Sequence, residues 1–96
     1  MYKIINLVKS PRKNKRYRVY LDDGNHYDFG LYGGDTYIDH HDENKRENYR
    51  KRHYAQEKHL IDKLIPSPSL FSYYISWGDS RHISKNIKKL NRLFSN

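Results

Sequence analysis

The sequence contains no cysteine and no apolar run of membrane-spanning length. The first absence excludes disulfides and thiolate metal sites, and it leaves the redox compartment open. The second argues against a transmembrane helix, which needs about 20 consecutive apolar residues. The segment Met1–Val8 is too short and too polar for a secretory signal peptide. We therefore expect the protein inside a cell, or inside a particle assembled there.

Glycine is also sparse, with 5 residues in all, and only Gly33-Gly34 forms a pair. A phosphate-cradling loop would need further glycines followed by a lysine, or a GxGxxG pattern opening a helix. Neither follows Gly34. The sequence therefore does not predict a nucleotide loop of either kind.

Apolar residues make up 35% of the 96 positions, and the mean hydropathy is −1.14. The chain compensates with 10 Tyr, 3 Phe and 1 Trp, whose rings bury large surfaces. A chain of this length buries a smaller share of its surface than a larger protein does. We expect one small domain over residues 1–96, with a thin margin of stability and a gain from binding to a partner.

The net charge of +8 is unevenly laid out along the sequence. Between Leu21 and Asn44 there is no Lys or Arg, whereas seven of the 11 acidic residues lie there. Opposite charges on facing surfaces orient partners and discriminate between them. We expect an acidic belt of Asp22, Asp23, Asp35 and Asp39 to face basic residues of a neighbour. Acidic protein or nucleic acid would then contact the basic candidates Arg12, Lys13, Arg16, Lys85, Lys88, Lys89 and Arg92.

Three segments predict β-strands, at about Tyr2–Val8, Lys15–Leu21 and Asn25–Phe29. The last two are separated by Asp22-Asp23-Gly24. A three-residue turn with Gly24 left-handed would pair Val19 with Tyr27 and Tyr17 with Phe29, which gathers the apolar side chains on one face. We therefore predict an antiparallel three-stranded meander.

Three helices are expected after the meander. Asp42 is a good N-cap for a long helix whose stripe begins with Tyr49 and His53 and ends in leucines. Ser67-Pro68 predicts a restart, followed by an apolar segment that reaches Trp77 and ends at Gly78. An amphipathic helix near the C-terminus completes an α+β fold.

The run Asp39-His40-His41-Asp42, together with His53, is the one cluster that suggests a metal site. Adjacent residues in a loop point apart, however, and His53 lies about 16 Å along the helix from its cap. We therefore predict no metal, no cofactor and no catalytic residue. His41 and Asp42 are expected to tie the loop to the helix, while Arg52 and His53 reach the sheet and the Trp77 segment.

The spacing of His40-x-Asp42, Arg46, Tyr49 and Arg52-His53, with a Tyr-rich hairpin before it and Trp77 after it, resembles a family of short uncharacterised proteins. Members of that family are encoded mainly by large nucleocytoplasmic DNA viruses. The resemblance extends from about Lys15 to Phe94. It implies a viral origin, a place in the virion, and passage through the host cytoplasm during assembly. The expected structural motif is His40, Asp42, Arg46, Tyr49, Arg52, His53 and Trp77.

Two functions remain open. The first is a non-enzymatic minor capsid or cement protein that binds neighbouring virion subunits. The second is a non-specific nucleic-acid-binding or genome-packaging protein. The acidic belt favours the first, because a surface that follows phosphates has no use for it.

Overall fold

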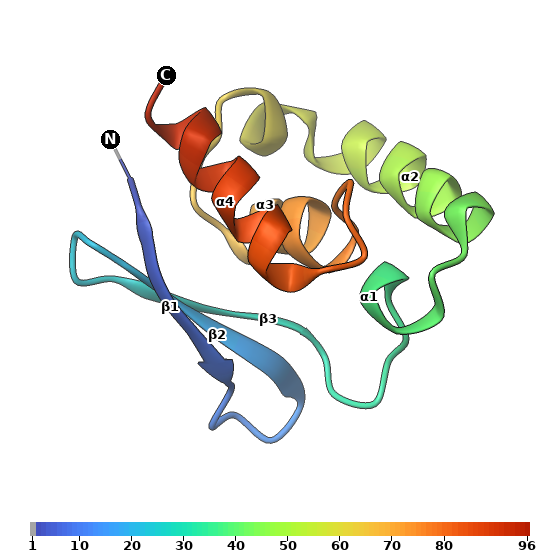
Figure 1. Cartoon of the computed structure of the whole chain (residues 1–96), viewed down its shortest axis with the longest axis horizontal. Coiled ribbons are helices and arrows are strands. Elements are labelled where there is room, and N and C mark those ends of the chain that lie inside the picture. Colours follow the sequence, from blue (N-terminus) through green and yellow to red (C-terminus); the bar gives the residue numbers. More distant parts are fainter. Residues whose placement is uncertain (1) are drawn as a thin grey trace.

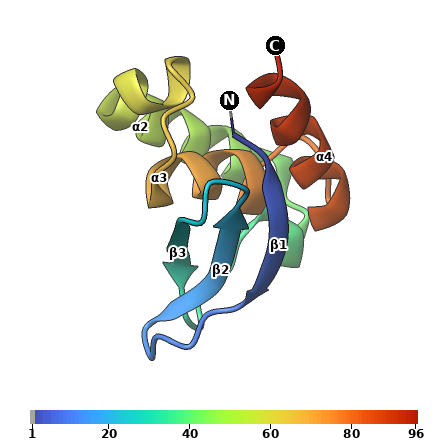
Figure 2. The same ribbon diagram turned by 90° about the vertical axis from the view of Figure 1, so that its left-hand side faces the viewer.

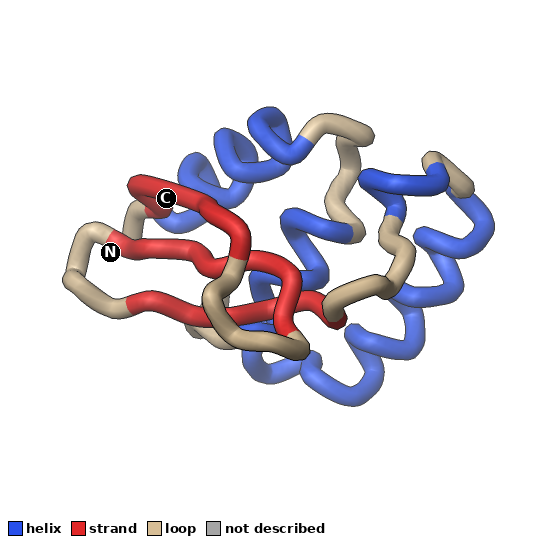
Figure 3. Tube along the Cα trace, turned by 90° about the horizontal axis from the view of Figure 1, so that it is seen from below, coloured by secondary structure: helices blue, strands red, loops and turns tan. Residues whose placement is uncertain are grey.

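The computed structural model describes residues 2–96 and is an α+β fold, as predicted. Strands β1 (Ile4–Lys9), β2 (Lys15–Leu21) and β3 (His26–Leu31) form one antiparallel sheet in the order β1-β2-β3. The helices that follow all lie on one side of this sheet (Figure 1, Figure 3). Both β1 and β3 are therefore edge strands, and the other face of the sheet is open to solvent (Figure 2).

The β2–β3 hairpin has the predicted register. Tyr17 pairs with Phe29 and Val19 pairs with Tyr27, while Gly24 has a φ of 90°. The backbone N–H of Leu21 donates to Asn25 O at 3.0 Å and closes the turn. Because this turn gathers the apolar side chains on one face, Val19 and Phe29 are both fully buried.

The helical part has more elements than the three predicted helices. A short helix α1 (Tyr37–His40) precedes α2 (Glu43–Asp62), which has a kink at Glu57. Helix α3 (Pro68–Phe71) runs directly into a π-helix, η1 (Ser72–Ser76). Helix α4 (Ile83–Phe94) ends the fold. Asp42 and Ser67 cap α2 and α3 with their side chains, as expected from the sequence.

The core lies between the sheet and the α3–η1–α4 layer. Its buried members are Ile4, Val19, Leu21, Phe29, Leu70, Phe71, Ile75, Leu90 and Phe94. Helix α2 contacts α3 and η1 and supplies no residue to this cluster. Its N-terminal half instead packs through polar and aromatic side chains, which is what its polar-to-aliphatic stripe predicts.

One glycine and one asparagine hold η1 against α4. The side-chain amide of buried Asn86 donates to Ile75 O at 2.8 Å and to Ser80 O at 2.9 Å, and Asn86 Oδ1 accepts from Ser80 N at 2.9 Å. A Cβ on Gly78 would lie 2.1 Å from Tyr74 O and 2.7 Å from Asn86 Cγ. Residue 78 therefore has to be glycine, because the backbone and Asn86 occupy the space of a side chain.

Candidate functional site

Strand β2 carries two arginines that neutralise acidic residues of the chain itself. The first, Arg18, donates from Nε to Asp28 Oδ1 at 2.9 Å and from Nη2 to Asp28 Oδ2 at 3.0 Å. Ser10 Oγ donates to the same carboxylate at 2.7 Å. Donation by Arg18, and then by Ser10, lowers the pKa of Asp28 to about 2 despite burial, which acts in the opposite direction. Asp28 is therefore a structural carboxylate.

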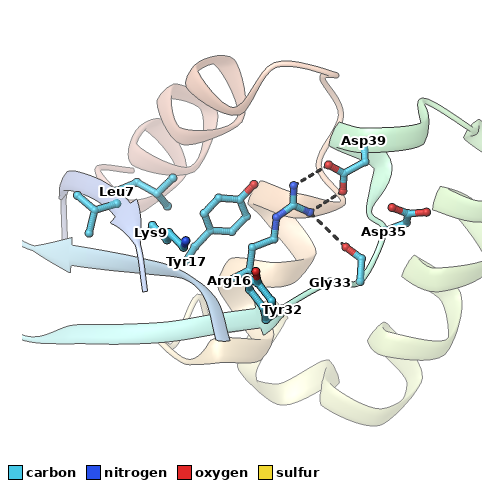
Figure 4. A pocket seen from close by; sticks show the side chains of 10 residues that line it. Leu7, Lys9, Arg16, Tyr17, Tyr32, Gly33, Asp35 and Asp39 are labelled. Atoms are coloured by element: carbon cyan, nitrogen blue, oxygen red, sulfur yellow. Dashed lines mark hydrogen bonds and ion pairs between the residues drawn. The ribbon is translucent and has the colours of Figure 1, made fainter. Parts of the chain in front are cut away.

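The second arginine, Arg16, forms an ion pair with Asp39. Its guanidinium donates to both carboxylate oxygens, at 2.5 and 2.6 Å (Figure 4). Asp39 also accepts from Thr36 N at 2.9 Å as part of the capping box of α1. Arg16, with help from Thr36, holds the pKa of Asp39 well below its usual range. Both residues were candidates for contact with a partner, but within the described chain they bind each other.

The predicted acidic belt does not form one surface. Asp22 and Asp23 lie in the β2–β3 turn, whereas Asp35 follows β3 at the opposite end of the sheet (Figure 2). Asp22 accepts from Lys3 N, and Asp23 accepts from Asn25 N. The four acids are separated because the run without basic residues follows the whole length of β3, beside the arginines of β2. Contact of these acids with a partner remains a prediction.

Basic side chains gather at the end of the sheet where Asp35 lies. Lys9, Arg12, Lys13 and Lys15 surround a hollow of about 330 Å³, together with Tyr32. None of these four bases forms an ion pair with another described residue. Tyr32 is 61% exposed, and the Lys9 ammonium lies 5.9 Å from its ring centroid. We call Lys9, Arg12, Lys13, Lys15 and Tyr32 the loop-end surface.

A larger hollow of about 640 Å³ adjoins the loop-end surface (Figure 4). Leu7 and Tyr17 form its apolar wall, and the Arg16–Asp39 pair forms its polar wall. Lys9 and Tyr32 line both hollows. The end of the sheet is therefore a continuous depression with a basic rim and exposed aromatic area.

The basic candidates on α4 lie in a different part of the fold. Lys85, Lys88 and Arg92 are exposed on this helix, which packs at the β1 side of the sheet near Ile4. Lys89 forms an ion pair with Asp79. Three of the four α4 candidates are therefore available to a partner, but they are separate from the loop-end surface.

Most residues of the predicted structural motif make contacts within the chain. His40 Nδ1 accepts from Asp42 N at 2.9 Å, and Asp42 caps α2. Arg46 donates to Gly78 O at 2.7 Å and to Asp79 at 2.6 Å. His53 Nε2 lies 3.1 Å from Ser69 O.

Arg52 is the exception in this motif, because its side chain is exposed and the role expected of it belongs to Arg50. The Arg50 Nη1 donates to Tyr73 O at 3.1 Å and to Trp77 O at 2.8 Å. The guanidinium carbon lies 3.9 Å from the Tyr73 ring centroid. The helix spacing from Arg46 to Arg50 is four residues, which places both arginines on one face and was the signal available in the sequence.

Five aromatic rings form a column between α2 and η1. Tyr49 stacks on Trp77, with centroids 4.2 Å apart and planes at 10°, and on His53, with centroids 4.9 Å apart. His40 lies against Trp77 at 5.3 Å, and Tyr73 lies beyond His53 at 6.3 Å. Burial raises the pKa of Tyr49, so its hydroxyl stays protonated at neutral pH. The column holds α2 against η1 through ring faces.

A third hollow opens beside this column and has a volume of about 390 Å³. We call it the serine cleft. Its lining includes Ser69, Ser72, Ser76 and Thr36, and the rings of Tyr49, His53 and Trp77. Lys15 lines it too, and therefore connects it to the loop-end surface. Ser76 is 1% exposed, and its hydroxyl has no hydrogen-bond partner within residues 2–96.

Among residues 2–96, no three His, Asp or Glu side chains converge in a way that could hold a metal ion. His40 and His53 instead belong to the aromatic column, and His40 Nε2 is buried without a partner in the described chain. The same part of the chain has no helix whose length and apolar content would let it cross a bilayer.

Residues 5–53 match a family of unknown function, DUF5754. The match covers about half of the chain, including the sheet and the motif from His40 to His53, and the chain therefore belongs to this family. No curated protein and no solved structure shows a significant match to the chain. The viral origin and the place in a virion remain predictions from the resemblance described above.

Proposed function

We propose that this chain is a non-enzymatic binding protein that holds single-stranded nucleic acid, without sequence preference, at its loop-end surface. The observation that carries the proposal is the gathering of four basic side chains without ion-pair partners around the exposed Tyr32 ring. Single-strand binders combine these two features, because lysines and arginines follow the phosphates while aromatic rings stack on bases.

The charge pattern supports the same proposal. Four of the 19 basic residues and four of the 11 acidic residues form ion pairs within residues 2–96. This leaves 15 basic side chains outside ion pairs, against seven acidic ones. The acidic belt was the reason to prefer a protein partner over phosphate, and that reason is weaker because Asp39 is paired with Arg16 and the other belt residues lie at opposite ends of the sheet.

The test is fluorescence anisotropy with a labelled single strand of about 12 nucleotides, a length within the range of single-strand binding sites. Affinity should fall steeply between about 50 and 200 mM salt, because binding releases counterions. The double variant Arg12→Gln/Lys13→Gln should bind more weakly. In a plot of log affinity against log salt concentration, the slope for this variant should be shallower by about 1.4. The variant loses two phosphate contacts, and each contact on a single strand contributes about 0.7 to the slope.

The matched control is Lys85→Gln/Lys88→Gln, which removes the same charge from exposed positions of α4. We expect this variant to keep most of the affinity and the wild-type salt slope. Equal losses in both variants would show that binding is spread over the whole basic surface. No binding at low salt would reject the proposed function itself.

A second candidate, an assembly subunit such as a minor capsid or cement protein, is favoured by edge strand β1. Ile5 is 61% exposed on this strand, and Val8 is also exposed. An exposed apolar edge strand is a surface on which another chain can pair. The variant Ile5→Lys should then block incorporation into particles while leaving the unfolding temperature unchanged. Recovery of the wild-type protein with the genome rather than with the particle shell would favour nucleic-acid binding over this candidate.

A further inference from the structure

We propose that the serine cleft is a nucleobase-binding site, which receives one base from a strand held at the loop-end surface. This inference rests on the proposed function. It adds a specific pocket and a ligand chemistry to the basic and aromatic loop-end surface.

The cleft has the size and the chemistry for such a guest. Its volume of about 390 Å³ falls within the range of small-molecule sites, which is about 300–1,000 Å³. The lining combines serine and threonine hydroxyls and the rings of Tyr49, His53 and Trp77 with apolar residues, two glycines and two charged residues. Hydroxyls that both donate and accept suit the mixed edge of a base, while ring edges suit its flat face.

The two charged residues of the lining are Lys15, which is half-buried, and Asp35, which is exposed. Lys15 also lines the loop-end surface, so this residue joins the cleft to the proposed phosphate path. A nucleotide likewise joins a neutral base to an anionic phosphate. The cleft would therefore take the base while Lys15 and its neighbours take the phosphates.

Ser76 gives this site an unused hydrogen-bonding group. Ser76 lines the cleft, and its hydroxyl is almost completely buried and lacks a partner within the described chain. Buried polar groups are rarely left unpaired, and an exception calls for an explanation. Ser76 is also the last residue of η1, and π-helical turns occur frequently at functional sites. A base in the cleft would supply the missing partner.

Tryptophan fluorescence reports directly on the serine cleft, because Trp77 is the only tryptophan in the sequence and lines this cleft. The probes are a single strand of about eight nucleotides, an abasic strand of the same length, and AMP. We expect the normal strand to change Trp77 fluorescence saturably and to bind at least fivefold more tightly than the abasic strand, since stacking and hydrogen bonding to one base are lost.

The key variant is Ser76→Ala, with Ser84→Ala on the exposed side of α4 as its control. If Ser76 has only a structural role, removing an unpaired buried hydroxyl should leave binding unchanged. If it binds a base, Ser76→Ala should weaken the normal strand about fivefold, leave the abasic strand unchanged, and keep or raise the unfolding temperature. Ser84→Ala should change neither strand.

The outcomes separate this inference from the proposed function. Equal affinity for normal and abasic strands, with unchanged Trp77 fluorescence, would overturn the base site while leaving phosphate binding intact. A saturable Trp77 response to AMP that Ser76→Ala weakens would support the base site and identify free nucleotide as a source, even if no strand binds. No response of Trp77 to any of the three probes would overturn the inference.

Discussion

Arg16 and Asp39 form a two-point ion pair that joins strand β2 to helix α1, with Nη1–Oδ2 at 2.5 Å and Nη2–Oδ1 at 2.6 Å. Their side chains are 25% and 28% exposed, so solvent screens the pair only in part. Asp39 also completes the capping box of α1. The pair therefore fixes the wall of the hollow beside the loop-end surface, and it connects the sheet to the segment that leads into α2.

The first prediction concerns this pair. A double-mutant cycle with Arg16→Gln and Asp39→Asn should give a coupling energy of about 1–2 kcal/mol in the free energy of unfolding, because the pair is two-point and partly shielded from water. Chemical denaturation of the four proteins measures it. An exposed pair would contribute only a few tenths of a kcal/mol. Asp35→Lys, at an exposed position, should leave the free energy of unfolding unchanged. Charge reversal at residue 35 alone therefore tests partner binding through the segment between β3 and α1 without a change in stability.

The fold and the motif were open to prediction from sequence to different degrees. The hairpin register followed from two choices of turn, only one of which put Tyr17, Val19, Tyr27 and Phe29 on the same face. The caps Asp42 and Ser67 followed from residue type. The division of the second predicted helix into α3 and η1 did not, because Asn86 and Arg50, which bind the η1 carbonyl groups of Ile75 and Tyr73, lie far from η1 in the sequence.

The candidate site was harder to predict from the sequence than the fold, because it too depends on contacts between residues that are distant in the sequence. Charge along the sequence predicts charge in space only when neighbouring strands do not neutralise it, and the pairing of Arg18 with Asp28 across β2 and β3 does so. The loop-end surface brings together residues from Lys9 to Tyr32, and the serine cleft joins Lys15 to Trp77. Such proximity is set by tertiary packing, which no local pattern contains.

The second prediction is a loss of stability in acid. The pKa of Asp28 is lowered from 3.8 to about 2 in the folded chain. Because the folded value lies below the ordinary one, the stabilisation is complete above about pH 4 and is lost progressively as the pH falls towards 2. Asp39 acts in the same direction. Thermal unfolding between pH 2 and 7 should show this fall, and Asp28→Asn should flatten it and lower the unfolding temperature at pH 7. Asp35→Asn should keep the wild-type profile.

The third prediction concerns Gly78. Substitution by alanine places a Cβ within 2.1 Å of Tyr74 O, which forces η1 and the Asn86 side chain to move. We expect a loss of at least about 2 kcal/mol in the free energy of unfolding, in the range of overpacked and strained sites. Ser84→Ala on exposed α4 should be nearly neutral. A wild-type stability for Gly78→Ala, measured by urea denaturation, would show that the η1–α4 junction adjusts without cost.

The last prediction separates two arginines that lie two residues apart on α2. Arg50 is half-buried, packs over Tyr73, and donates to the carbonyl groups of Tyr73 and Trp77, whereas Arg52 is exposed. Burial lowers the pKa of Arg50, but two bound carbonyl oxygens and the ring face retain its charge. Arg50→Gln shortens the side chain and leaves both carbonyl groups without their donor, so it should lower the free energy of unfolding by about 2 kcal/mol.

Arg52→Gln removes the same charge from the same helix and should change the free energy of unfolding by less than about 0.5 kcal/mol. The fluorescence of Trp77 should shift in the Arg50 variant and stay unchanged in the Arg52 variant, because only Arg50 fixes the backbone that carries the indole ring. Urea denaturation followed at this single tryptophan measures both quantities at once. Equal losses in the two variants would mean that the charge of α2, rather than the contact with η1, is what stabilises this face. A loss confined to Arg52→Gln would return the structural role to the residue that the sequence motif first suggested.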